Sequence, residues 1–241
     1  MNPGRSTFAD AHIHVSERGF GSGYPDIGDA EVLFGCTARP SEWDDMLGCE
    51  VPGTVRFYGV HPWYADEWDA AVSDRLRSML EKDEAANVGE IGLDSKRGPL
   101  DQQIAAMDDQ LDIASDLGRM ANIHMVGCEK EVLESVRRHG RGCSAIVLHS
   151  FSSESYVKPF ADAGCMFSLN PRILARSEPR LVRLLDAIPR DRLLVETDAP
   201  YLARGFEGMH CFAERLGDVM GLDGDEVLGI TLGNARRVAG V

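Results

Sequence analysis

Histidines and carboxylates recur in this sequence where short apolar, β-rich runs end. One run closes with Asp10-Ala-His12-Ile-His14, and Glu90 lies within another, GEIGLD at residues 89–94. Strand side chains alternate between two faces, so His12 and His14 point the same way and can share one metal ion. A glutamate in an apolar strand is rarely buried without a partner, which for Glu90 is either a metal ion or an arginine.

Three later runs end in the same residue types. His124 and His149 each close a run, and Glu196-Thr-Asp198 follows the last one. Either histidine alone is as readily explained as a hydrogen-bonded residue of the core. Together with the first two runs, however, they supply four imidazoles and two carboxylates, which are ligands of divalent cations.

Apolar runs and amphipathic segments alternate along the chain. The runs predict eight strands, at residues 7–14, 32–37, 55–61, 87–93, 120–125, 144–149, 165–169 and 192–197. Helical periodicity predicts helices at 67–82, 101–117, 129–139 and 178–188, with two more after about residue 207. Because parallel neighbours need a crossover of a dozen or more residues, the alternation predicts parallel pairing.

Eight such units predict an α/β fold, a (β/α)8 TIM barrel of the metal-dependent hydrolase type, in one domain over residues 1–241. An open doubly wound sheet is the alternative, although no G-x-G-x-x-G or Walker loop follows the first strand. In a barrel the C-terminal strand ends form one face, where active sites are built. The predicted metal ligands that meet there are His12, His14, Glu90, His124, His149 and Asp198. Six ligands exceed the need of one tetrahedral ion but suit two ions bridged by a carboxylate, and Glu90 is the predicted bridge.

Composition restricts the partners of this protein. The net charge of −14 argues against a wide nucleic-acid-binding surface, but not against a small phosphoester held by metal ions. No apolar stretch is long enough to span a membrane, and the N-terminus has no apolar signal region. The six cysteines contain no C-x-x-C pair and read as reduced thiols. We therefore expect a cytoplasmic protein, a monomer or weak oligomer without an obligate protein partner.

Seven motifs, in this order, resemble those of the TatD family of metal-dependent deoxyribonucleases, which are amidohydrolase-type barrels. They are DAHIH (10–14), GVHPW (59–63), GEIGLD (89–94), IH (123–124), HSFS (149–152), ETDAPYL (196–202) and NARRV (234–238). The resemblance implies a (β/α)8 barrel with two divalent ions, zinc, magnesium or manganese, that hydrolyses DNA. The expected substrates are DNA ends or single strands, digested from 3′ to 5′.

The resemblance also implies roles for individual residues. His12, His14 and Asp198 would bind the first ion, and His124 and His149 the second, with Glu90 between the two. His61 of GVHPW would contact the substrate phosphate. The chain departs from the family after His124, where Met125-Val126-Gly127 lacks the usual arginine, and in HSFSS at 149–153, where the family has cysteine and glycine in the second and fifth places.

The expected chemistry is attack of a metal-activated water on phosphorus, with Asp198 as the general base and Glu90 as the other catalytic residue. Glu196 and Asp10 are candidates to orient the ligands. Arg172, after the seventh strand, either reaches a phosphate or lies in solvent. Two alternatives use the same fold: a dinuclear hydrolase of a small phosphoester, amide or ester, and a scaffold without catalysis.

Overall fold

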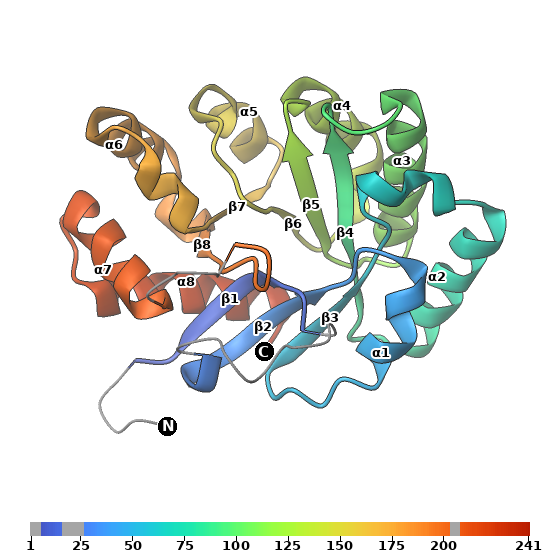
Figure 1. Cartoon of the computed structure of the whole chain (residues 1–241), viewed down its shortest axis with the longest axis horizontal. Coiled ribbons are helices and arrows are strands. Elements are labelled where there is room, and N and C mark those ends of the chain that lie inside the picture. The colour runs from blue at the N-terminus through green and yellow to red at the C-terminus, as the bar shows by residue number, and fades with distance from the viewer. Residues whose placement is uncertain (1–5, 16–26, 203–207) are drawn as a thin grey trace.

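Eight parallel strands, paired in the order in which they occur in the chain, curl into a nearly closed barrel (Figure 1). The structure is a computed structural model that describes residues 6–15, 27–202 and 208–241. The strands are β1 Phe8–Ile13, β2 Ala30–Cys36, β3 Thr54–Tyr58, β4 Asn87–Asp94, β5 Ala121–Val126, β6 Ile146–Leu148, β7 Met166–Leu169 and β8 Leu193–Val195. The predicted (β/α)8 architecture is confirmed, and residues 1–5, 16–26 and 203–207 of the predicted domain lie outside the described ones.

From β2 onward, each strand is followed by one or two α-helices on the outside of the barrel (Figure 1). They are α1 Trp43–Leu47, α2 Ala70–Lys82, α3 Leu100–Asp116, α4 Glu129–His139, α5 Val157–Asp162, α6 Glu178–Ala187, α7 Met209–Met220 and α8 Gly224–Ala239. Six of them match the segments that periodicity predicts. The short helices α1 and α5 were not predicted, because five or six residues are too few to show a helical repeat.

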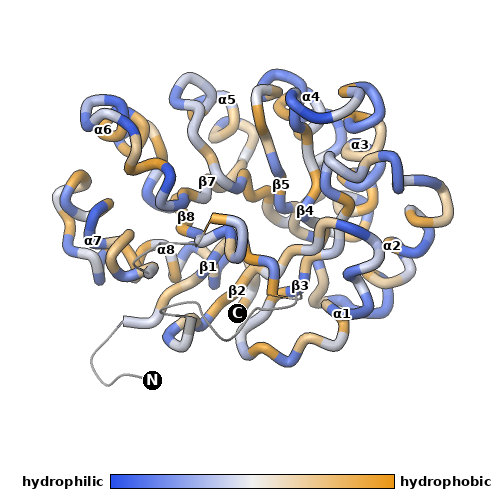
Figure 2. The backbone as a smooth tube through the Cα atoms, viewed as in Figure 1, coloured by the Kyte–Doolittle hydropathy of each residue, from blue (hydrophilic) through white to orange (hydrophobic). Residues whose placement is uncertain are grey.

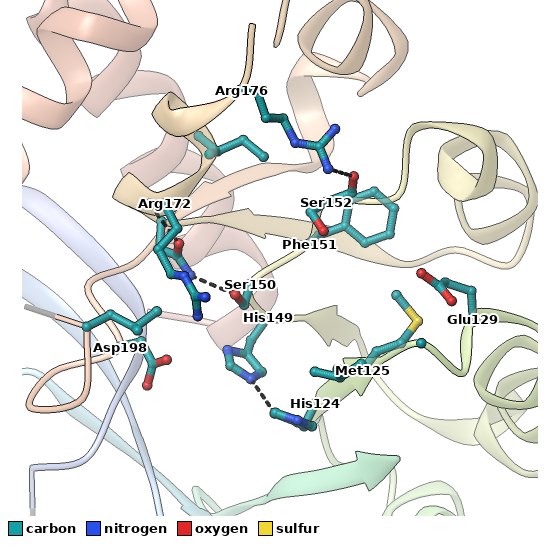
Figure 3. Close-up of a pocket in the computed structure, with 15 residues that line it drawn as sticks. His124, Met125, Glu129, His149, Ser150, Phe151, Ser152, Arg172, Arg176 and Asp198 are labelled. Atoms are coloured by element: carbon teal, nitrogen blue, oxygen red, sulfur yellow. Dashed lines mark hydrogen bonds between the residues drawn. The ribbon is translucent and has the colours of Figure 1, made fainter. Parts of the chain in front are cut away.

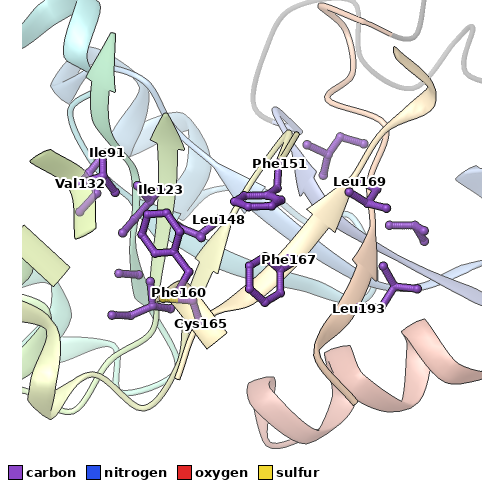
Figure 4. Close-up of a cluster of buried hydrophobic side chains, with 14 of the residues drawn as sticks. Ile91, Ile123, Val132, Leu148, Phe151, Phe160, Cys165, Phe167, Leu169 and Leu193 are labelled. Carbon is purple, nitrogen blue, oxygen red and sulfur yellow. The ribbon is translucent and has the colours of Figure 1, made fainter. Parts of the chain in front are cut away.

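Between the strands and the outer helices lies the larger hydrophobic cluster. Figure 4 shows Ile123 of β5 and Leu148 of β6 in this layer, together with Val132 of α4 and Phe160 of α5. Figure 2 shows why the layer forms: the strands are rich in apolar residues, while the helices carry both polar and apolar ones. Each large apolar side chain buried here contributes roughly 1.5–3 kcal/mol, so the layer fixes the strands that carry the polar residues.

A second cluster forms an apolar floor beneath the polar end of the barrel. It contains Val147 of β6 and Leu194 of β8, each two residues before a polar side chain, His149 and Glu196 respectively. Residues two apart in a strand share a face, so each polar group lies above an apolar one. The floor separates the C-terminal face from the rest of the interior.

The barrel closes between β1 and β8 through hydrogen bonds beyond the strand ends. The backbone amide of Asp198 donates to the carbonyl of His12 (3.0 Å), and that of His14 donates to Ala199 (2.9 Å). The buried carboxylate of Asp10 accepts from both the backbone amide (2.9 Å) and the hydroxyl of Thr197. This seam fixes three of the predicted metal ligands relative to one another.

The sequence-based expectations about membrane-spanning segments and about the cysteines can be compared with the described residues. Among them, no helix combines the length and apolar character needed to cross a membrane. No disulfide joins cysteines in these parts of the chain, and Cys36, Cys128 and Cys165 are buried while Cys49 and Cys143 are half-buried.

Candidate metal centre

The six predicted metal ligands lie together at the C-terminal ends of the strands. His12 belongs to β1 and His14 follows it, Glu90 and His124 belong to β4 and β5, and His149 and Asp198 follow β6 and β8. All are buried except His124, which is partly buried. A cluster of this kind is costly to bury unless its members are paired or bind a cation.

One half of the cluster faces a single oxygen of Glu90. The Oε2 atom lies 3.3 Å from His12 Nε2 and 3.4 Å from His14 Nε2. The two imidazole nitrogens are 3.3 Å apart, and Asp198 Oδ1 lies 3.9 and 3.8 Å from them. Four potential ligand atoms therefore converge on one point.

The other half faces the second oxygen of the same carboxylate. Glu90 Oε1 lies 3.0 Å from both His124 Nδ1 and His149 Nε2, which are 3.1 Å apart. Each carboxylate oxygen of Glu90 thus faces its own pair of histidines. That is the arrangement of a bridging carboxylate between two cations.

Two buried polar side chains fix which histidine nitrogens face the centre. Asn122 donates from Nδ2 to the Ala11 carbonyl (2.9 Å), so its oxygen accepts from His12 Nδ1 (3.0 Å). Glu196 Oε1 lies 3.3 Å from His149 Nδ1 and accepts from the Ser150 amide at 2.7 Å. In their neutral forms, which bind cations, His12 and His149 carry their protons on Nδ1 and direct the Nε2 lone pairs inward.

His61 is held differently from the other histidines. It follows β3 and begins the 3-10 helix η3 (Pro62–Glu67), where its Nδ1 accepts from the Trp63 backbone amide at 3.1 Å. A neutral imidazole in this tautomer carries its proton on Nε2, which lies 3.3 Å from Glu90 Oε1. Burial lowers the pKa of His61 to about 4, so the ring is a neutral donor. His61, Glu90 and His124 also lie close enough together to hold an ion by geometry alone.

Charge in the cluster is strongly coupled. Burial raises the pKa of Glu90, but the neighbouring imidazoles of His61, His12 and His149 outweigh it and hold the pKa well below its usual range. Burial alone would lower the pKa of His149, but the carboxylates of Glu90 and Glu196 outweigh burial and hold that pKa well above its usual value. Burial raises the pKa of Asp198 above its usual value, which suits a carboxylate that accepts a proton.

Glycines allow β4 to carry Glu90 into the centre. A Cβ on Gly92, whose φ is +140°, would lie 2.0 Å from the His124 carbonyl oxygen. A Cβ on Gly59 would lie 2.7 Å from the carbonyl carbon of Gly89. The neighbouring backbones therefore approach more closely than any other residue type permits, and Glu90 reaches both pairs of histidines.

Two pockets meet at the cluster and share His124, His149, Arg172, Asp198 and Leu202. The aromatic pocket, about 240 Å³, is lined by Trp63, Tyr64 and Tyr201 in addition. The arginine pocket, about 380 Å³, is lined by Ser150, Ser152, Arg176 and Glu129 among others (Figure 3). The cluster is therefore open to solvent from two sides.

The remaining predicted residues lie around this centre. Glu196 is buried against His149, as described above. Asp10 instead accepts hydrogen bonds from the backbone amides of His12 and Thr197 and from the Thr197 hydroxyl, so it holds the seam between β1 and β8. Arg172 lies in the 3-10 helix η6 (Pro171–Ala175), exposed, at the junction of the two pockets.

Sequence reasoning missed two polar residues of the site. Asn122 lies two residues before His124, and Asp94 lies four residues after Glu90. Asp94 Oδ2 accepts from Trp63 Nε1 at 2.7 Å and lies 3.7 Å from His124 Nε2. Strand alternation places residues two or four apart on one face, so the same rule that pairs His12 with His14 indicates both.

Comparisons with known proteins agree on one family. The family described as TatD related DNase matches residues 9–240. The chain is 30% identical over 219 residues to the "uncharacterized metal-dependent hydrolase TatD" of Mycobacterium tuberculosis, covering 84% of this chain and 80% of that protein.

A second relative is the "3′-5′ ssDNA/RNA exonuclease TatD" of Klebsiella pneumoniae, 29% identical over 207 residues, with 84% of this chain and 77% of that protein covered. Among solved structures, a TatD homologue from Escherichia coli superposes with a TM-score of 0.81 at 20% identity. The match covers 97% of this chain and 98% of that one, and shows the shared fold.

Proposed function

The chain belongs to the family of TatD-related DNases, and we propose that it is a metal-dependent 3′-5′ exonuclease that hydrolyses the phosphodiester bonds of single-stranded nucleic acid. The observation that carries this proposal is the position of Glu90, whose two oxygens face separate pairs of histidines. The relative named as an exonuclease supports nucleic acid as the substrate.

The residues of the cluster suit two divalent cations. His12, His14 and Asp198 would hold one ion and His124 and His149 the other, with Glu90 shared between the two. A mixed set of imidazole nitrogens and carboxylate oxygens favours zinc or manganese, whereas magnesium prefers ligands that are all oxygen. The inward lone pairs of His12 and His149, fixed by Asn122 and Glu196, support this assignment.

Two bound cations would supply a water of lowered pKa and would stabilise negative charge on the phosphoryl oxygens. Asp198 is the residue placed to take the proton of the attacking water. It is 9% exposed and lines both pockets, so its carboxylate reaches both the cluster and an incoming substrate. Burial raises its pKa above the usual value, which makes the carboxylate a better proton acceptor.

Two further side chains are placed to hold the scissile phosphate. His61 carries its proton on Nε2, which can donate to a phosphate oxygen beside Glu90. Arg172 extends into both pockets, and its planar guanidinium can bind phosphate through two hydrogen bonds. These local donors explain how a chain of net charge −14 binds a polyanion.

The direct test uses a 5′-labelled single-stranded DNA with magnesium, manganese or zinc. We expect a ladder of labelled fragments that shortens from the 3′ end, no cleavage after chelation, and none by Asp198→Asn. Hydrolysis of p-nitrophenyl phosphate or of an amide, without cleavage of any oligonucleotide, would refute the proposal in favour of a small-molecule hydrolase.

A further inference from the structure

The two pockets flank the cluster from different directions and differ in chemistry. The aromatic pocket exposes large rings, with 46% of Trp63 and 57% of Tyr201 accessible. The arginine pocket instead gathers Arg172 and Arg176 with the hydroxyl-bearing Ser150 and Ser152 (Figure 3). A substrate that spans the centre must therefore present different groups to the two sides.

The arginine pocket is built to receive an anion. Arg172 and Arg176 lie four residues apart around η6, and the Asn170 side chain accepts from the Arg172 amide at 3.2 Å. Arg176 donates to the Ser152 carbonyl, which holds its guanidinium beside the pocket. Within the described residues, the Arg172 guanidinium makes no hydrogen bond or ion pair, so its donors are available to a phosphate.

The aromatic pocket is built to receive a base. Among its described lining residues Arg172, which it shares with the other pocket, is the only arginine, and no lysine lines it. Trp63 is held by its hydrogen bond to Asp94, and the Arg97 guanidinium lies over its ring at 4.4 Å from the centroid. The indole is fixed and 46% exposed, so the ring face away from Arg97 offers a stacking surface that accepts any base, because every base has a π face.

We propose that a single-stranded nucleic acid crosses the metal centre in one direction. The 3′-terminal base lies in the aromatic pocket against Trp63 and Tyr201, and the phosphate 5′ to the scissile one lies on Arg172 and Arg176. This inference rests on the proposed exonuclease function. The direction follows from charge, because the terminal nucleotide carries no further phosphate whereas the remaining strand does.

The arginine pocket also limits how many phosphates of the substrate it recognises. Glu129 lines the same pocket, and its carboxylate accepts from the Ser153 hydroxyl. A carboxylate on the side of this pocket away from the arginines (Figure 3) repels a second phosphate there. The pocket therefore recognises one phosphate beyond the scissile bond.

The test for direction compares three thymidine dinucleotides: unphosphorylated, 5′-phosphorylated and 3′-phosphorylated. We expect the 5′-phosphate to raise kcat/KM by about tenfold, equivalent to ~1.4 kcal/mol, and the 3′-phosphate to give no gain. Arg172→Met and Arg176→Met should each reduce the ratio of 5′-phosphorylated to unphosphorylated substrate toward one. Arg180→Met is the matched control, because Arg180 is exposed on α6 outside both pockets.

The test for the base compares dinucleotides with and without a base on the 3′ residue. The wild-type protein should prefer the intact one about tenfold, a factor within the range of one base–aromatic stack. Trp63→Ala should abolish the preference. Trp63→Phe should retain it, because phenylalanine keeps the stacking face and loses only the hydrogen bond to Asp94.

Three outcomes distinguish failure of this inference from failure of the proposed exonuclease function. A gain from the 3′-phosphate instead of the 5′-phosphate reverses the direction and overturns the inference. Unchanged ratios in the arginine and tryptophan variants overturn it as well, while the exonuclease function stands. If the wild-type protein hydrolyses neither bis(p-nitrophenyl) phosphate nor any oligonucleotide with the three metals, the proposed function itself fails and the inference with it.

Discussion

Replacing Asn122 by alanine probes how the protein prepares His12 for a cation. Asn122 is fully buried, and its amide joins the His12 imidazole (3.0 Å) to the Ala11 carbonyl (2.9 Å). The variant removes the acceptor that keeps the His12 proton on Nδ1. It also leaves a buried carbonyl without its donor.

The two losses have different magnitudes and different readouts. Loss of a residue that orients a metal-binding histidine weakens metal affinity by about 10- to 100-fold. At a metal concentration of about 100 times the wild-type Kd, binding stabilises the wild-type fold by ~2.7 kcal/mol. A Kd raised by 10- to 100-fold leaves about 1.4 to 0.4 kcal/mol of that stabilisation. The unpaired backbone carbonyl costs a further ~1–3 kcal/mol whether or not metal is present.

Asn87→Ala is the matched control for this variant. Asn87, at the start of β4, is also buried and also joins two backbone groups, accepting from the Met120 amide (2.9 Å) and donating to the Ala85 carbonyl (3.1 Å). It touches no residue of the cluster. Urea unfolding in chelator should show comparable losses for both variants, whereas titration with metal should show the lost affinity in Asn122→Ala only. Wild-type metal affinity in Asn122→Ala would refute the reasoning.

Three further predictions concern the bridging role of Glu90, the seam between β1 and β8, and the close approach of β4 and β5. Glu90→Gln should bind fewer than two ions per chain by elemental analysis and lose about 10²-fold or more in hydrolysis of bis(p-nitrophenyl) phosphate; retention of both ions would contradict a bridging role. Asp10→Ala should lower the free energy of unfolding by ~1–3 kcal/mol, because Thr197 loses its buried acceptor. Asp10→Asn should lower it by less, and equal losses in the two variants would contradict the role of Asp10 in joining β1 to β8. Gly92→Ala should destabilise the protein by about 1–3 kcal/mol or more because its Cβ meets a β5 carbonyl, whereas Gly233→Ala in the open interior of α8 should stabilise it by ~0.5–1 kcal/mol; matching stabilities in urea would contradict the close approach of β4 and β5.

The barrel was predictable because each strand has its own apolar run between polar segments. The strand predicted at 120–125 is Ala121–Val126, and the helix predicted at 129–139 is Glu129–His139. The predicted strand ends were less accurate where a side chain caps the element that follows the strand. The strand predicted at 55–61 stops at Tyr58, because the His61 side chain caps the following 3-10 helix.

The candidate site was predictable to the extent that strand periodicity determines it. His12 and His14 were paired by alternation, and the same rule would have found Asn122 and Asp94. The contact between Asn170 and Glu196 (3.1 Å) was not predictable, because it depends on the path of the chain after β7 and β8. The two pockets depend on how several such loops lie next to one another, and no sequence pattern encodes that arrangement.

Anomalous diffraction from crystals of the metal-loaded protein tests the central assignment most directly. We expect two peaks about 3.5–4 Å apart, with one oxygen of Glu90 bound to each ion and with His12 and His149 on different ions. A single peak, or two peaks with Glu90 turned away from both, would contradict it.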